Sequence, residues 1–201
     1  MDKIGITGGS FNPVHIAHLI IAQRFAEHFS LDSIYFIPAW VSPFKAKDEI
    51  TIAPDHRVSM LRLAILDNPL FKMDLFEIEQ KGISYTLDTI GHMRKSHPGA
   101  MLHLMTGTDQ AARFDEWKSP EEILSCAKLC VARRPSADSE SEMKKIENLD
   151  VFRNHKPEFF DAPLLEISAT EIRARTKKGA AIKYLVTPPV EEYIRMNNLY
   201  K

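Results

Sequence analysis

The chain has 201 residues, 44% of them hydrophobic, which is enough for a substantial core in one large domain or two small ones. Lysine and arginine number 26 against 27 for aspartate and glutamate, so the formal net charge of −1 gives no basic field of the kind that binds nucleic acid. No apolar run approaches the ~20 residues that span a bilayer, and the N-terminus lacks the pattern of a signal peptide. We therefore expect a cytoplasmic protein with no nucleic-acid partner and no membrane partner.

The two cysteines favour the same compartment. Cys126 and Cys130 fit neither a disulfide framework nor a CxxC metal knuckle, which favours a reducing environment over secretion. We expect both side chains to act as small hydrophobic residues of the core.

Strand and helix patterns alternate along the chain. A short apolar run closed by two glycines predicts a buried strand over 3–7, and apolar residues three and four apart predict a helix over 16–29. The same patterns predict further strands over 33–38, 71–79, 100–107, 127–135 and 162–168, and helices over 55–66, 85–97, 169–179 and 188–198. Residues 39–54 fit a long loop, and the polar segment 136–148 fits a solvated surface helix or loop.

This alternation predicts an α/β fold with a mostly parallel sheet and helices on both faces. The sequence shows no internal repeat and no convincing linker, so we expect a single domain over residues 1–201.

The first predicted turn, in "GGSFNPVHIAH", has the residues of an anion site. Glycines let backbone N–H groups approach a phosphate closely, and the positive end of the following helix adds attraction. The segment is neither a Walker A loop nor a GxGxxG turn, and it lacks the GxSxG that would make Ser10 a nucleophile. His15 and His18 share one helix face, but a metal site would need a third ligand. Each histidine also fits a partly buried, hydrogen-bonded residue, whereas a donor pair for phosphate oxygens explains both.

"GGSFNPVHIAH" resembles the GxFxPxHxGH motif of the nucleotidylyltransferase superfamily, and "ISATEIR" at 167–173 resembles its second motif, ISxTxxR. The segments "GISYTLDTI" at 82–90 and "GTDQAARFDEWK" at 107–118, with the C-terminal "YLVTPPVEEYIRMNNLY", are similar to the bacterial nicotinate-nucleotide adenylyltransferases. The resemblance covers essentially the whole chain. It implies a Rossmann-like, doubly wound fold and an adenylyltransferase that joins the AMP moiety of ATP to nicotinate mononucleotide, giving deamido-NAD and pyrophosphate by in-line attack without a covalent intermediate.

The resemblance also implies the site residues. The catalytic residues would be His15, His18 and Arg173. The ATP-binding residues would be Gly8, Gly9, Ser10, Phe11, His15, His18, Gly107, Asp109, Ile167, Ser168, Thr170 and Arg173. The residues that bind nicotinate mononucleotide would be Lys45, Tyr85, Thr86, Asp88, Trp117 and Arg133. Mg²⁺ is expected to come with ATP, since the sequence shows no metal cage made of protein ligands alone.

Physical chemistry gives several of these residues a defined task. Ser168 three residues before Glu171 predicts a capped helix whose N-terminus is a second anion site, and Arg173 lies where a guanidinium could bind departing pyrophosphate. Asp109 could accept a hydrogen bond from a ribose hydroxyl. Trp117 could stack on a pyridine ring, but it fits a core residue too.

The sequence differs from the family pattern at two positions, and other protein families share part of that pattern. Ala17 stands where the superfamily motif has glycine, and Phe44 where the family commonly has histidine before the lysine, here Lys45. Phosphopantetheine adenylyltransferase shares both motifs but not the SYT and Trp segments. An aminoacyl-tRNA synthetase would need an anticodon-binding region, which 201 residues without a basic excess do not accommodate. A non-catalytic nucleotide-binding module would tolerate loss of His18 or Arg173, and both residues are present. A monomer and a homo-oligomer both fit the sequence.

Overall fold

A computed structural model describes residues 1–41, 52–134 and 137–201. Within these residues, six strands form one sheet in the order β3-β2-β1-β4-β5-β6. The strands are β1 (Lys3–Gly9), β2 (Ser33–Pro38), β3 (Phe71–Met73), β4 (Met101–Gly107), β5 (Lys128–Arg133) and β6 (Glu158–Asp161). Each pairing is parallel. This is the doubly wound Rossmann order, with its switch point between β1 and β4, and it confirms the predicted fold class.

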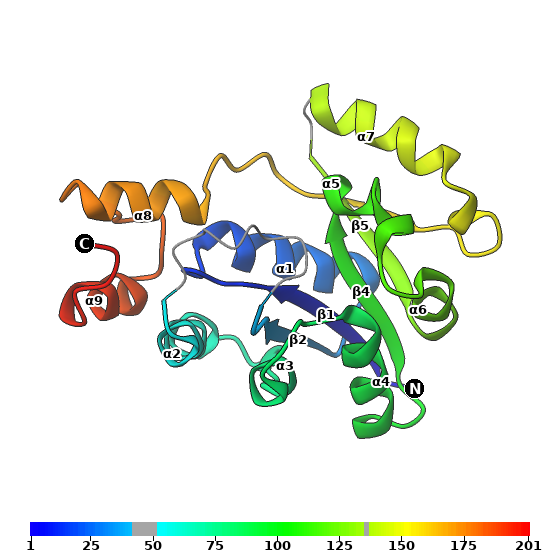
Figure 1. Cartoon of the computed structure of the whole chain (residues 1–201), viewed down its shortest axis with the longest axis horizontal. Helices are drawn as coiled ribbons and strands as arrows, with labels where there is room; N and C mark the ends of the chain where they lie inside the picture. The colour runs from blue at the N-terminus through cyan, green and yellow to red at the C-terminus, as the bar shows by residue number, and fades with distance from the viewer. Residues whose placement is uncertain (42–51, 135–136) are drawn as a thin grey trace.

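The helices lie on both faces of this sheet (Figure 1). They are α1 (Ile16–Phe29), α2 (Pro54–Ile65), α3 (Phe76–Gln80), α4 (Thr86–Ser96), α5 (Thr108–Ala111), α6 (Pro120–Cys126), α7 (Ala137–Asn148), α8 (Ala169–Lys177) and α9 (Pro188–Met196). In Figure 1, α8 and α9 form one end of the molecule and α7 lies toward the other. None of the described helices is long and apolar enough to cross a membrane.

Two hydrophobic clusters cover the two faces of the sheet. Successive strand residues alternate between them: Ile34 and Phe36 belong to one cluster and Ile37 to the other. The first cluster packs the sheet against α1, α2, α8 and α9, and the second against α4, α6 and α7. In β1, Gly5 keeps α1 close, because a methyl group there would lie 2.7 Å from Leu31 Cδ1 and 2.8 Å from Phe25 Cε1.

Two strand predictions are wrong. The strand expected over 71–79 stops at Met73, because the carboxylate of Asp74 accepts a hydrogen bond from the backbone N–H of Phe76 (2.8 Å) and starts α3. The strand expected over 162–168 is irregular chain, and the sheet instead gains β6 just before it. Ala162 still donates to the carbonyl of Arg133 (2.8 Å), but Pro163 has no N–H with which to continue the ladder.

Other expectations from the sequence have clear outcomes. The polar segment that fits a surface helix or loop contains α7, and Cys130 is buried in the core as expected. Cys126 is only half-buried and accepts a hydrogen bond from Arg94 Nη1 (2.9 Å). Neither cysteine forms a disulfide. Most of the expected long loop, including Phe44, lies outside the described residues.

Candidate functional site

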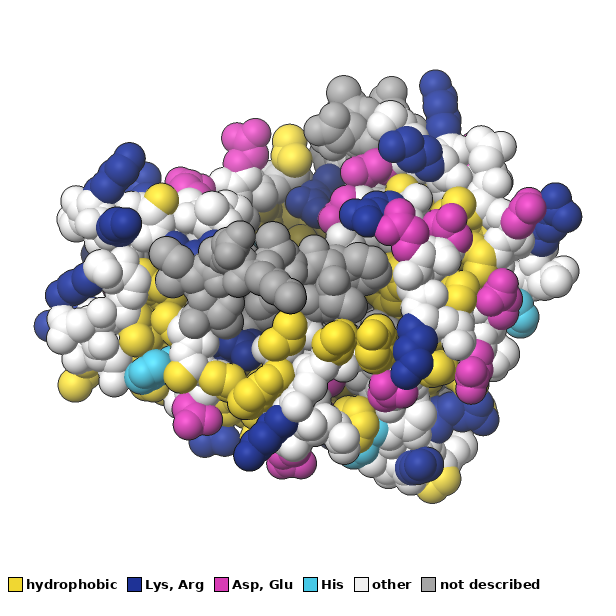
Figure 2. All heavy atoms as spheres, in the orientation of Figure 1, with side chains coloured by type: hydrophobic (Ala, Val, Ile, Leu, Met, Phe, Trp, Pro, Cys, Tyr) yellow, Lys and Arg dark blue, Asp and Glu magenta, His cyan; other side chains and the backbone are white. Residues whose placement is uncertain are grey.

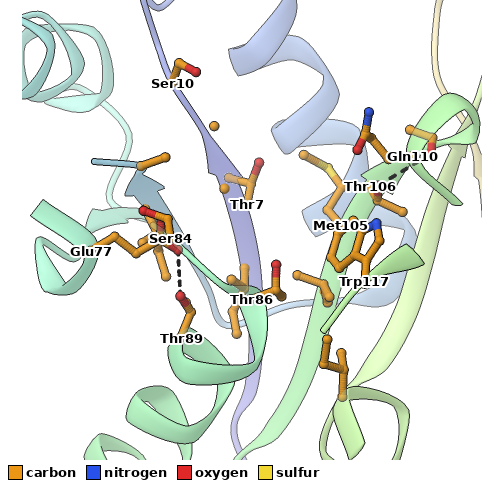
Figure 3. A pocket seen from close by; sticks show the side chains of 18 of the residues that line it. Thr7, Ser10, Glu77, Ser84, Thr86, Thr89, Met105, Thr106, Gln110 and Trp117 are labelled. Atoms are coloured by element: carbon orange, nitrogen blue, oxygen red, sulfur yellow. Dashed lines mark hydrogen bonds between the residues drawn. The ribbon is translucent and has the colours of Figure 1, made fainter. Parts of the chain in front are cut away.

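A cavity of about 780 Å³ opens at the carboxyl ends of β1 and β4, at the switch point of the sheet. Ligands of open α/β sheets bind at this position. In Figure 3, Glu77, Ser84 and Thr89 lie on one side of the cavity and Met105, Gln110 and Trp117 on the other. The predicted site residues that line it are Gly8, Gly9, Ser10, His18, Tyr85, Thr86, Gly107 and Trp117.

The two histidines of the first motif have different positions. His18 lines the cavity, whereas His15 is buried behind it, with only 8% of its surface exposed. Their rings lie 3.7 Å apart between centroids, and the backbone N–H of His15 donates to Nδ1 of His18 (3.2 Å). A neutral imidazole that accepts through Nδ1 carries its proton on Nε2, so this contact sets the tautomer of His18. Burial lowers the pKa of His15 to about 4, which keeps its ring neutral at pH 7.

Gly8 and Gly9, which the sequence places in the first turn, are instead the last residues of β1 and pair with Ile37 and Pro38 of β2. Two arginines hold the turn that follows them. Arg57 of α2, which is 1% exposed, donates from Nη1 to the carbonyl of Ser10 (2.7 Å). Arg173 of α8 donates from Nη1 to the carbonyl of Asn12 (2.8 Å), across 161 residues of sequence. The two sequence motifs therefore meet at one turn. Phe11 lies in this turn with a left-handed φ of 46°, buried, with its ring edge-on to His18.

The second motif forms the start of α8 as predicted. Ser168 is the N-cap, and its hydroxyl accepts a hydrogen bond from the backbone N–H of Glu171 (3.1 Å). Thr170 accepts from Nη2 of Arg173 (3.2 Å), and Ile167 packs at the edge of the first hydrophobic cluster. None of these residues lines the cavity itself, so the second motif reaches the site through its contact with the turn.

The end of β4 brings a carboxylate and a guanidinium together. A Cβ at Gly107 would lie 2.5 Å from Asp109 Oδ1 and 3.5 Å from Arg134 Nη2, so both side chains lie beside this position and the Asp109 carboxylate would have to move to admit a larger residue. Arg134 lines the cavity. Arg133, the predicted substrate residue, instead forms an ion pair with Asp161 (2.8 Å) and does not line the cavity.

The SYT segment and the tryptophan lie on opposite sides of the cavity (Figure 3). Tyr85 is the N-cap of α4, and Lys118 lies 4.5 Å above its ring. Lys118 also pairs with Asp88 (3.4 Å), which does not line the cavity. The ring of Trp117 both lines the cavity and packs against Phe114, at 4.8 Å between centroids. Lys45 lies outside the described residues.

One carboxylate of the cavity wall, the buried Glu77, is not among the residues predicted from the sequence. Thr89 Oγ1 donates to Glu77 Oε1 (2.6 Å), and Ser84, which accepts from the backbone N–H of Trp40 (3.0 Å), is its second hydrogen-bond partner. Burial raises the pKa of Glu77, while both hydrogen bonds oppose this shift. Glu77 thus ties the SYT segment and the first turn of α4 to the end of β2. The sequence predicts a strand over 71–79, so no helical periodicity points to Glu77.

Other features of the site concern Ala17, metal ligands and surface charge. Ala17 is buried and does not line the cavity, so its methyl group packs inside the protein.

Across the described ranges, no group of three or more His, Cys, Asp or Glu side chains could hold a metal ion. On the face drawn in Figure 2, positive and negative side chains are interspersed, which agrees with the near-zero net charge.

The buried state of His15 predicts acid sensitivity. The unfolded chain takes up this proton near the ordinary pKa of 6.5 and the folded chain only near 4, so the unfolded state binds more protons in between. As the pH is lowered from about 6.5 to about 4, the free energy of unfolding should fall by up to about 1.4 kcal/mol for each pH unit. His15→Gln should lose this part of the slope in urea unfolding, whereas His28→Gln, at an exposed position of α1, should keep it. Equal slopes in all three proteins would contradict the assignment.

Comparisons with known proteins agree with this geometry. The cytidylyltransferase-like family model matches residues 6–175. The nicotinate-nucleotide adenylyltransferase of Bacillus subtilis is 34% identical over 201 residues and covers 100% of both chains. A relative from Dictyoglomus thermophilum, named "Probable nicotinate-nucleotide adenylyltransferase", is 40% identical over 98% of this chain and 99% of its own.

A solved structure extends the likeness to the fold. It is the nicotinic acid mononucleotide adenylyltransferase of Plasmodium falciparum complexed with NaAD, with a TM-score of 0.74 at 21% identity, covering 100% of this chain and 98% of that one. At this identity the match shows the fold alone. Together with the full-length sequence matches, it leads to one conclusion: the chain belongs to the nicotinate-nucleotide adenylyltransferases, a group of nucleotidyltransferases with the cytidylyltransferase-like fold.

Proposed function

We propose that this enzyme transfers the AMP moiety of ATP to nicotinate mononucleotide, releasing pyrophosphate and giving deamido-NAD. The observation that carries the proposal is the contact between Arg173 and Asn12, because it brings the second motif to the turn between β1 and His18. The cavity beside this turn also falls within the ~300–1,000 Å³ usual for small-molecule sites.

The reaction we propose is a direct displacement. The 5′-phosphate of nicotinate mononucleotide attacks the α-phosphorus of ATP, and pyrophosphate leaves on the opposite side. A phosphate monoester has a second pKa of about 6, so the nucleophilic dianion is abundant at neutral pH and no general base is needed. The site must hold the reacting atoms in line and stabilise the charge that develops on the phosphates.

His18 is the proposed donor to the phosphates of ATP. Its Nδ1 accepts from the backbone of His15, so the neutral ring presents its N–H at Nε2. The backbone N–H of Ser10 would add a donor at the turn, and Gly8 and Gly9, the last residues of β1, line the cavity beside it. His15 would act from behind, because its neutral ring packs against that of His18.

The leaving pyrophosphate needs positive charge around it. We assign pyrophosphate to Arg173 and the N-terminus of α8, and we add Arg134, which lines the cavity beside Gly107. Asp109 is the proposed acceptor for a ribose hydroxyl. Mg²⁺ would arrive bound to ATP phosphate oxygens and water, where it neutralises negative charge, since the described residues offer no cage of their own.

The second substrate would occupy the side of the cavity formed by the SYT segment. The N-terminus of α4, with Thr86, suits the nicotinate carboxylate, and Trp117 across the cavity suits the pyridine ring. Glu77 would keep this wall in place through Thr89 and Ser84.

We also propose that residues 1–201 form one domain, since one sheet carries both hydrophobic clusters. The cytoplasmic location stays a prediction.

Substrate choice tests the function directly. The protein, Mg²⁺ and ATP are incubated separately with nicotinate mononucleotide, nicotinamide mononucleotide and phosphopantetheine, and pyrophosphate release is measured. We expect the fastest release with nicotinate mononucleotide. Inactivity with all three would contradict the proposal, and release with phosphopantetheine alone would assign the chain to a sister activity.

His18 tests the phosphate contact. His18→Ala should lower kcat by roughly one to three orders of magnitude, because a donor to charge that develops in the transition state is lost. His18→Gln, which keeps an amide donor near the position of Nε2, should retain more activity than His18→Ala. An unchanged kcat in His18→Ala would reject this role.

A further inference from the structure

The C-terminal end of the chain returns to the turn that follows β1. After α9, Leu199 is buried in the first hydrophobic cluster and its N–H donates to the carbonyl of Ile194 (3.1 Å). The next residue, Tyr200, donates from its hydroxyl to Asn12 Oδ1 (2.8 Å), across 188 residues of sequence. A residue next to the C-terminus thus contacts the turn after β1 directly.

Asn12 connects this tyrosine to the second motif. Its side chain accepts from Tyr200 and its backbone carbonyl accepts from Arg173 (2.8 Å), while the residue itself is 2% exposed. Arg57 holds the neighbouring carbonyl of Ser10. Side chains from α2, α8 and the C-terminal segment therefore fix three polar groups of one turn.

Tyr200 makes these contacts as a neutral phenol. Burial raises its pKa above the ordinary value, although Arg173 and Arg57 nearby act in the opposite direction. The hydroxyl therefore stays protonated and donates a hydrogen bond to Asn12 Oδ1. Because it carries no negative charge, Tyr200 leaves the positive charge of the two arginines available to an anion.

We infer that Tyr200 is a positioning residue of the phosphate site, acting through Asn12 on the turn and on Arg173. This inference rests on the proposed function, in which that turn and Arg173 bind the phosphates of ATP. It gives the C-terminal segment a role in binding ATP, in addition to its packing in the core.

Two tyrosine variants test the inference. Tyr200→Phe removes only the hydroxyl, and it should weaken ATP binding about three- to tenfold in isothermal titration calorimetry, as expected for loss of one buried hydrogen bond. In the pyrophosphate-release assay, Tyr200→Phe should lower kcat/KM for ATP by a similar factor and leave KM for nicotinate mononucleotide within twofold of the wild-type value. Tyr193→Phe is the matched control, since it removes a tyrosine hydrogen bond of the same region, to His56 Nδ1 (3.0 Å), that does not reach the turn.

The outcomes are distinct. Equal ATP affinities for Tyr200→Phe and Tyr193→Phe would overturn the inference, and so would a loss in Tyr200→Phe that affects both substrates equally. In an Asn12→Ala background, Tyr200→Phe should have no further effect on ATP affinity, and additive losses would show that Tyr200 does not act through Asn12. Calorimetry needs no turnover, so a wild-type enzyme that binds ATP but transfers nothing would contradict the proposed function and leave this comparison valid.

Discussion

The hydrogen bond from Arg173 Nη1 to the carbonyl of Asn12 joins the two halves of the sheet at the switch point. One partner follows β1, the first strand of the chain, and the other belongs to α8, which comes after β6, the last strand. The doubly wound topology makes this contact possible, because every parallel strand delivers its carboxyl end to the same edge. The turn, the glycines that end β1, the histidine pair and the cavity all lie at this edge.

Electrostatics at this edge is local. The chain as a whole is nearly neutral, and its charges are mixed over the face in Figure 2. At the turn, in contrast, two guanidiniums meet backbone carbonyls while both His15 and Tyr200 are kept uncharged by burial. Arg57 is buried, and a buried cation is costly unless it is hydrogen-bonded or meets an anion. Arg57 and Arg173 are hydrogen-bonded to the turn, and a triphosphate would supply the anion in the proposed reaction.

Sequence patterns predicted the alternating elements and the capped helix after 168, because both depend on local spacing. The predicted residues that line the cavity came from the family resemblance. The differences depend on contacts that no hydrophobic periodicity shows. The choice between Arg133 and Arg134 depends on how β5 ends, since neighbouring strand residues point to opposite faces. Glu77 is not predicted because the segment 71–79 has the pattern of one strand, whereas in the structure Asp74 ends β3 and starts α3. Tyr200 carries no motif signal of its own, since its partner is 188 residues away.

The most direct measurement is a crystal structure of the protein with Mg²⁺ and a non-hydrolysable ATP analogue. Our account predicts phosphate oxygens at about 2.7–3.2 Å from His18 Nε2 and from the guanidinium of Arg173, with the adenosine toward Gly107 and Asp109. A triphosphate held elsewhere, for instance against Lys144 and Lys145 of α7, with His18 and Arg173 out of contact, would contradict it.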